Sequence, residues 1–500
     1  MPRSVVTPNE WLPRAALIVL AVTALRVALL AQGATDLFVD EAQYWLWGQT
    51  LDFGYYSKPP MIAWVIRAAT ELGGSDAPFW VRLPAPLFHA ATALILGAIA
   101  SRLWAGAAIW VSAIYVTLPM VAVGSYLIST DTIMFPFLAA GLLLWIGVPG
   151  GTRGRAFAAG VALGLAFLSK YAAIYYLPCA ALAAFFPEAR PTWRQALLAL
   201  GAFALTIAPN VAWNIAHGLS TVEHTMDNAD WVREGGGGGL LWRDLGTFFA
   251  SQFAVFGPVL FAVLLWMGGR LRRAPLRIPI LFALPIVAFV CVQALLGGAY
   301  ANWAAAAYLA GTVAVVPWLL AAGQGWASFP PAHPIPALWW WRTGRPWLWG
   351  SLVLHGAFCL AIPLLTAFGT HLAAGPDDRL ILARYLGRDE MSGAIVRAAR
   401  DTGAEAIVAD DRDVLADLFY SERDTGIAIY SVPPEGRAMN HYAQSFPWPG
   451  GDAPFLLVTK RDRLPEGCAA ERLTRLAPAR GAYRDRKQTL WLAGPECPLR

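Results

Sequence analysis

Long apolar runs, separated by short segments rich in arginine, fill the first 370 residues of the chain. A helix of about 20 apolar residues crosses the hydrocarbon core of a bilayer, and the pattern contains about eleven such runs. We predict membrane spans at 11–30, 80–100, 105–127, 132–148, a pair within 156–187, 195–215, 246–268, 277–297, 303–322 and 347–369. The pattern therefore predicts a mainly α-helical, multi-pass membrane protein.

The composition supports this prediction and narrows the range of partners. Hydrophobic residues make up 57% of the chain and charged residues only 14%, with a mean hydropathy of +0.48, which excludes an ordinary soluble domain. The net charge of +5 comes from arginines that we place beside anionic lipid headgroups. We therefore expect this protein to contact membrane lipids and not nucleic acid.

The arginines also predict an orientation. If successive runs alternate in direction, these arginines fall on one side, which the positive-inside rule identifies as the cytoplasm. The first run holds Arg14 and Arg26 and shows no cleavage signature, so we expect it to be retained, with the N-terminus in the cytoplasm. The segment 156–187 has arginines at both ends, which predicts a hairpin with its tip near 169–171 on the outer side. An inner (cell) membrane location and a periplasmic C-terminus follow.

The composition changes after about residue 370. A helix is predicted at 384–402, and strands are predicted at 404–409, 426–430, 454–459 and 489–492. We therefore predict two domains, a transmembrane domain over 1–370 and a small α/β domain outside the cytoplasm over 371–500. Cys468 and Cys497 lie in this second domain, and a disulfide between them is one outcome that an oxidising compartment allows.

The first outer loop contains several charged and aromatic side chains at the expected edge of the bilayer. It carries Asp40 and Glu41, then aromatic residues, then Tyr55, Tyr56 and Lys58. Charged groups are costly at this depth unless they handle something charged, such as a lipid phosphate. A structural alternative is a helix start, with Asp40 as N-cap and residue 43 at the capping-box position. A second short helix is expected from Pro59 or Pro60 to Gly73 or Gly74.

These residues are part of a pattern that resembles a known family of enzymes. Asp-Glu-Ala-x-Tyr-Trp-x-Trp from Asp40, Gly-Tyr-Tyr-x-Lys-Pro-Pro from Gly54, Ser-Thr-Asp ending at Asp131 and Leu-Ser-Lys-Tyr ending at Tyr171 resemble glycosyltransferase families 39 and 83. This group contains protein O-mannosyltransferases and the aminoarabinose transferase of lipid A. The resemblance implies a GT-C fold and an enzyme that moves a sugar, with inversion, from a polyprenyl-phosphate carrier. The implied acceptor is a lipid, glycan or protein at the outer membrane face.

The resemblance also implies roles for individual side chains in the first loop. Asp40 matches the family's first-loop aspartate, expected to act as general base or to orient the acceptor, with Glu41 beside it. Lys58 matches the lysine that neutralises the carrier phosphate, with Tyr55 and Tyr56 before it. The pattern departs at Ser57, where the aminoarabinose transferases have a glutamate used in metal binding. Metal dependence is therefore left open, and a divalent metal ion is the one cofactor considered.

Two further motifs lie at the expected outer ends of later runs. Asp131 is a candidate for orienting the acceptor or the loop, with a helix N-cap as the structural alternative, although Ser129 or Thr130 would serve equally well as the cap. Lys170 is expected to bind phosphate together with the hydroxyl of Tyr171, and a lysine that snorkels to the interface is the alternative.

The longest remaining outer loop spans about 216–244. His217, Glu223 and His224 are candidates for binding a metal ion, but their spacing matches no dedicated motif. Arg233 is a further candidate for the donor phosphate, and the glycines 235–239 suggest a moving lid over the site. A solvated mobile loop is the alternative. Side chains suited to a sugar ring follow at Tyr300, Asn302 and Trp303, with a helix cap as the alternative for Asn302 and an interfacial anchor for Trp303.

Two other functions compete with glycosyl transfer. A lipid or solute transporter or flippase also has many spans and a few buried charges, but the sequence shows no internal repeat. A protein that binds polyprenyl lipid for assembly, without chemistry, is favoured if Asp40 is only a cap. Glycosyl transfer is what the resemblance implies, and the charges, which gather in two outer loops, argue against a transporter.

Overall fold

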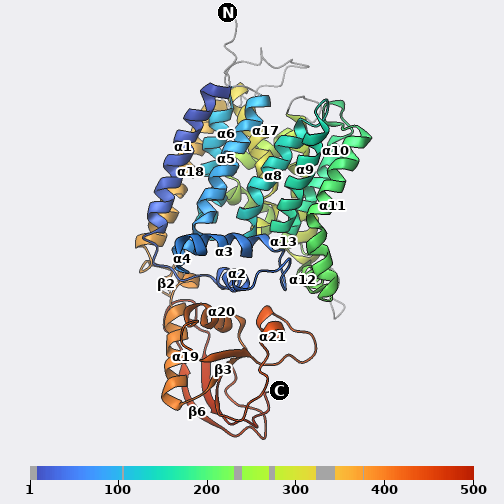
Figure 1. Cartoon of the computed structure of the whole chain (residues 1–500). Helices are drawn as coiled ribbons and strands as arrows, with labels where there is room; N and C mark the ends of the chain where they lie inside the picture. The colour runs from blue at the N-terminus through green and yellow to red at the C-terminus, as the bar shows by residue number, and fades with distance from the viewer. Residues whose placement is uncertain are drawn as a thin grey trace, which may run out of the picture. The chain divides into compact units, whose positions relative to one another are not determined.

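The computed structural model describes residues 8–103, 106–229, 239–269, 276–322, 344–375 and 377–499 (Figure 1). The chain forms two compact units, each built from separate stretches of sequence. The first unit contains Met1–Leu30, Lys58–Ile62 and Arg82–Pro363, and the second contains Ala31–Ser57, Ala63–Val81 and Leu364–Arg500. Most of the first loop thus belongs with the C-terminal residues, and the boundary placed after residue 370 remains a prediction.

Helices make up the first unit. They are α1 (Pro8–Leu30), α5 (Pro84–Leu103), α6 (Ala108–Thr117), α7 (Pro119–Gly124), α8 (Thr130–Ile146), α9 (Arg153–Ser169), η1 (Tyr171–Tyr175), α10 (Tyr176–Ala183), η2 (Pro187–Ala189), α11 (Trp193–Ala216), α12 (Ser220–Ala229), α13 (Trp242–Val255), α14 (Pro258–Gly268), α15 (Arg277–Leu281), α16 (Leu284–Gly297), η3 (Ala301–Ala304), α17 (Ala307–Ala322) and α18 (Gly344–Phe368). The prediction of a mainly helical membrane protein is confirmed.

The described residues set limits on the number of membrane spans but do not fix it. Five helices among them are long and apolar enough to cross a bilayer, or six if one bent pair counts as a span, and several shorter apolar helices accompany them. The count of about eleven therefore remains a prediction. The segment predicted as a hairpin, 156–187, contains α9 followed by η1 and α10, and the break after α9 falls at Lys170, inside the predicted tip.

One predicted span is wrong in shape. The run at 246–268 forms two helices, α13 and α14, which meet at an angle of 115°. Gly257 lies at the bend with a φ of +96°, and Pro258 follows it. A Cβ atom at position 257 would overlap the ring of His355. Hydropathy does not detect such a bend, because it depends on a glycine conformation and on a contact with a distant helix.

Small residues let three helices of the first unit approach closely. Figure 1 shows α8, α9 and α11 side by side, and α9 packs against both of the others. On α9, Gly160 lies against the backbone of Ala199, and Gly164 lies against Thr206. Small side chains at such positions allow van der Waals contact between helix backbones inside a membrane.

The second unit contains a mixed sheet. Its elements are α2 (Val39–Gln49), α19 (Arg388–Thr402), β3 (Ala406–Ala409), α20 (Arg412–Ser421), β4 (Ala428–Ser431), α21 (His441–Ser445), β5 (Phe455–Thr459), β6 (Ala470–Leu476) and β7 (Gln488–Ala493), with the short elements β1 (Ala373–Ala374), β2 (Arg379–Leu380) and η6 (Ala383–Tyr385). Helices α3 (Met61–Gly73) and α4 (Pro78–Arg82) each have residues in both units. The strand order is β4-β3-β5-β7-β6, and the first three strands are parallel.

The α/β character predicted for the C-terminal residues is confirmed, and so is the disulfide between Cys468 and Cys497. The bond joins the segment before β6 to the end of the chain. The remaining cysteines, at positions 179, 291 and 359, are free.

Candidate functional site

A partly buried polar cluster lies at the end of the α8–α9 pair in the first unit. The Nζ of Lys170 lies 2.7 Å from each carboxylate oxygen of Asp131. Asn302 donates from Nδ2 to the same carboxylate, at 2.9 Å. The side chains of Asp131 and Lys170 are only 12% and 19% exposed. The structure therefore brings together two predicted site residues and Asn302, an amide that the sequence offered either for a sugar ring or as a helix cap.

Helix ends explain why these side chains meet. Asp131 lies in the first turn of α8, where the helix dipole stabilises a negative charge. Lys170 is the C-cap of α9, where the same effect stabilises a positive charge. The N-cap of α8 is Ser129, whose hydroxyl accepts from the Thr132 amide at 3.3 Å. Asp131 is therefore not the cap, and its carboxylate is available to hold the lysine.

Tyr171 follows Lys170 but has different partners. Its hydroxyl donates to Oδ1 of Asn210 at 3.1 Å and accepts from Nδ2 of Asn214 at 3.4 Å. Both asparagines are buried side chains of α11. The predicted pairing of the Lys170 ammonium and the Tyr171 hydroxyl on one phosphate remains a prediction, since the hydroxyl already links η1 to α11.

A second cluster lies in the second unit and contains Asp40. Its Oδ1 accepts a hydrogen bond of 2.6 Å from Nη2 of Arg412, and both side chains are partly exposed. Gln43, one turn further along α2, accepts from Nη2 and Nε of the same guanidinium at 2.9 and 3.1 Å. Burial by itself lowers the pKa of Arg412, but the Asp40 carboxylate more than offsets this effect and the pKa is raised. Asp40 is thus an accessible carboxylate with a fixed cationic partner.

The start of α2 differs from the prediction. Phe38 is the N-cap, and Asp40 lies inside the first turn, so the assignment of Asp40 as N-cap and of residue 43 to the capping box is wrong. The capping-box residue is Glu41, whose carboxylate accepts from the Phe38 amide at 2.9 Å. Glu41 is fully buried, and through this contact it stabilises the start of α2. The predicted cap was two residues too late, because the motif calls for a side-chain acceptor at the N-cap and Phe38 has none.

The tyrosines of the first loop are buried in the second unit. The Tyr55 ring stacks on Trp47, with centroids 5.0 Å apart, and its hydroxyl donates to the Thr50 carbonyl at 3.1 Å. Burial raises the pKa of Tyr55 to about 12. The Tyr56 hydroxyl donates to the Ala438 carbonyl at 3.1 Å. These contacts hold the loop, so donor binding by either tyrosine remains a prediction. Lys58, in the first unit, is half-buried.

The remaining candidates are dispersed or lie outside the described residues. His217 is the C-cap of α11, where its ring stacks on Trp213. Glu223 is exposed and His224 half-buried on α12. In the described part of the chain, no three His, Cys, Asp or Glu side chains are grouped so as to hold a metal ion. Arg233 and the glycines at 235–238 lie outside that part, so their roles are untested.

Sequence reasoning missed Arg412. A signal was available, because Asp410-Asp411-Arg412-Asp413 directly follows strand β3. The carboxyl ends of parallel strands are the usual place for functional side chains in an α/β sheet. The cluster of charges at that position did not indicate which partner Arg412 would find 372 residues earlier in the chain.

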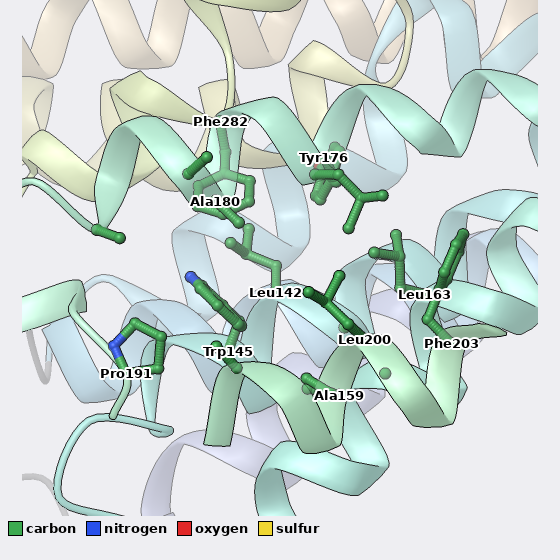
Figure 2. Close-up of a pocket in the computed structure, with 17 residues that line it drawn as sticks. Leu142, Trp145, Ala159, Leu163, Tyr176, Ala180, Pro191, Leu200, Phe203 and Phe282 are labelled. Carbon is green, nitrogen blue, oxygen red and sulfur yellow. The ribbon is translucent and has the colours of Figure 1, made fainter. Parts of the chain in front are cut away.

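An apolar cavity of about 250 Å³ lies among α8, α9, α10 and α11 of the first unit (Figure 2). Leu163, Tyr176 and Phe203 line it together with Trp145 and Pro191. Along α8, the lining residues from Gly141 onward lie at least ten positions beyond Asp131, which corresponds to about 15 Å of helix. An apolar cavity of this kind suits a hydrocarbon chain.

Comparison with known proteins adds independent information. A family model described as dolichyl-phosphate-mannose-protein mannosyltransferase matches residues 57–213. The lipid A galacturonosyltransferase RgtD of Rhizobium johnstonii is 40% identical over 495 residues, covering 96% of this chain and 98% of that protein.

Solved structures show a similar fold. ArnT from Cupriavidus metallidurans in the apo state has a TM-score of 0.60 at 16% identity, covering 96% of this chain and 99% of that one. The same protein bound to undecaprenyl phosphate has a TM-score of 0.57 at 16% identity, covering 98% of this chain and 100% of that one.

Proposed function

This chain belongs to the GT-C glycosyltransferases, the family that includes lipid A galacturonosyltransferase RgtD, and we propose that it transfers a uronic acid such as galacturonic acid to lipid A. It is a multi-pass membrane enzyme. One observation carries the proposal: the 40% identity to that relative extends over 96% of this chain, so both compact units are included. A transporter or a non-catalytic lipid-binding protein has no comparable support.

The proposed donor is a sugar linked to polyprenyl phosphate. ArnT was solved with undecaprenyl phosphate, and we assign the same class of carrier to this chain. The ammonium of Lys170 is held by Asp131, whose carboxylate also accepts from Asn302, and it offers positive charge to a phosphate at the end of the bundle. Lys58 is proposed to share this task. The apolar cavity lined by α8 to α11 offers room for part of the isoprenoid chain.

The proposed reaction is a single displacement with inversion. A hydroxyl oxygen of the acceptor attacks the anomeric carbon, and the bond from that carbon to the phosphate oxygen breaks. The electron pair leaves on the polyprenyl phosphate, whose charge the lysines stabilise. Asp40 takes the proton of the attacking hydroxyl as general base. Its first-turn position on α2 and its contact with Arg412 hold the carboxylate in place for this step.

The orientation proposed for the chain has the N-terminus in the cytoplasm, the second unit in the periplasm and the helices in the inner membrane. The disulfide between Cys468 and Cys497 supports a periplasmic location, because disulfides persist in oxidising compartments. The second unit, over its stretch from 364 onward, is proposed to contribute to recognition of the acceptor.

Purified enzyme in lipid vesicles tests the proposal. It is offered radiolabelled polyprenyl-phosphate sugars, among them the galacturonic acid and aminoarabinose forms, with lipid A as acceptor, at several concentrations of divalent ions. We expect labelled lipid A from the uronic acid donor, and a loss of at least about a hundredfold in turnover in D40N. Movement of a lipid between leaflets without sugar consumption would establish a transporter instead. Full turnover by D40N would remove the assigned base but leave the substrate class intact.

A further inference from the structure

Two side chains of α2 hold one guanidinium. Asp40 and Gln43 are three residues apart, so they project from the same face of the helix. Nη2 of Arg412 bonds to both, and Nε bonds to Gln43 as well. A planar group with several donors in fixed directions suits this arrangement better than a lysine would, because an ammonium on a flexible stem does not fix two acceptors in one plane.

Arg412 is presented from a rigid base. It is the first residue of α20, and the N-cap Asp411 accepts from the Asp413 amide at 2.8 Å. Lys460 and Arg486 also bind the buried Asp411 carboxylate. Burial by itself raises the pKa of Asp411, but these cations more than offset it, so the pKa is lowered and the carboxylate stays ionised. The backbone at Arg412 is therefore anchored from the residue that follows β5 and from the segment before β7.

The surroundings leave Asp40 and Gln43 as the acceptors of the guanidinium. On α21, Tyr442 is fully buried near Arg412, and the pKa of His441 is lowered to about 4 by burial and by Arg412. His441 is therefore neutral near pH 7 and does not compete as a second cation. On α2 itself, the neighbouring acid Glu41 is buried and caps its own helix.

We propose that Arg412, together with Gln43, is a positioning residue for Asp40: the C-terminal residues hold the general base in its reactive orientation through this guanidinium. The inference rests on the proposed function, in which Asp40 accepts the proton of the attacking hydroxyl. A small displacement of a base from its reactive geometry costs a large factor in rate, even when the substrates still bind. Arg412 thus acts on turnover and leaves donor affinity unchanged.

A purely structural role would give a different result. Arg423, just beyond α20, also binds α2 and the segment after α3, because its guanidinium lies over Trp45 and 3.9 Å from Asp76. Among the described residues, Arg423 forms neither a hydrogen bond nor an ion pair with Asp40. R423Q therefore removes a cation that also contacts α2, from the segment just after α20, without touching the proposed base, and it serves as the matched control.

The experiment measures R412Q, R412K, Q43A and R423Q in the full-length enzyme in vesicles, with a uronic acid donor and lipid A. We expect kcat of R412Q to fall at least about tenfold with an unchanged KM for the donor, and R412K to recover part of that loss. Q43A should lose less than R412Q, and R423Q should stay within about twofold of wild type. Thermal unfolding and binding of undecaprenyl phosphate are measured for each variant.

Specific outcomes overturn the inference. If kcat is lost equally in R412Q and R423Q, or only in proportion to lost thermal stability, Arg412 has a packing role. If R412Q keeps full turnover while D40N is inactive, the inference fails and the proposed function stands. If D40N is fully active, the assignment of the base has failed first. In the D40N background, R412Q should cost little further activity, because its effect is transmitted through Asp40.

Discussion

The Nζ of Lys170 lies 2.7 Å from both carboxylate oxygens of Asp131, although 39 residues separate the two in sequence. The contact joins the start of α8 to the end of α9, and Asn302 binds the same carboxylate from a third segment. Three separate stretches of chain therefore converge on one carboxylate at the end of an apolar bundle. The pair both fixes this end of the bundle and holds the cation assigned to the donor phosphate.

Removing either partner of this pair should reduce stability and activity together. K170M leaves the Asp131 carboxylate buried with only Asn302, and we expect a loss of about 2 kcal/mol in the free energy of unfolding and at least about a hundredfold in turnover. The double variant D131N/K170M should regain stability without regaining activity. Thermal unfolding in detergent and vesicle turnover measure both effects. Additive stability losses in the double variant would contradict the pairing.

A single methyl group on α9 should separate two packed helices. A Cβ atom at Gly160 overlaps the carbonyl oxygen of Ala199, so G160A should lower the free energy of unfolding by about 1–3 kcal/mol. Gly201 on α11 has open space where its Cβ would lie, and G201A is the matched control. It should be neutral or slightly stabilising, because alanine favours a helix. Equal unfolding temperatures for the two variants would rule out the close contact.

Acidification should destabilise the second unit through His441. Its pKa is about 4 in the folded state, below the ordinary value of 6.5. Between pH 4 and pH 6.5, His441 is therefore protonated in the unfolded chain but neutral in the folded chain. The stabilisation is complete above about pH 6.5 and is lost as the pH falls toward 4, by about 2 kcal/mol. The unfolding temperature of wild type should therefore fall more steeply in this window than that of H441Q. Parallel curves would exclude His441 as the source.

The disulfide should contribute to the stability of the second unit. Cys468 and Cys497 are 29 residues apart, and closing a loop of this length restricts the unfolded chain by about 3 kcal/mol. C468S/C497S should therefore unfold at a lower temperature than wild type, and reduction of wild type should have a similar effect. C291S, at a free and half-buried cysteine, is the control and should change little. If the reductant has no effect on wild type but C468S/C497S is destabilised, the serines themselves are responsible.

Local patterns in the sequence were enough to predict the mainly helical character of the first unit, the α/β character of the C-terminal residues and the break at Lys170. These features depend on runs of 5 to 20 residues and on caps, which neighbouring side chains determine. The register of the α2 cap was wrong by two residues, and the bend at Gly257 was missed. Both features depend on small differences in free energy between alternative caps or alternative backbone conformations.

The sequence by itself identified Asp40, Asp131 and Lys170 as candidates, because charges are costly beside an apolar run. Only the tertiary structure decided their partners: Lys170 and Asn302 for Asp131, and Arg412 for Asp40. Arg412 lies 372 residues after Asp40, and no local pattern specifies a hydrogen bond across that distance. The pairing results from the packing of α2 on α20, which buries apolar and aromatic surface along both helices and brings the charges within reach.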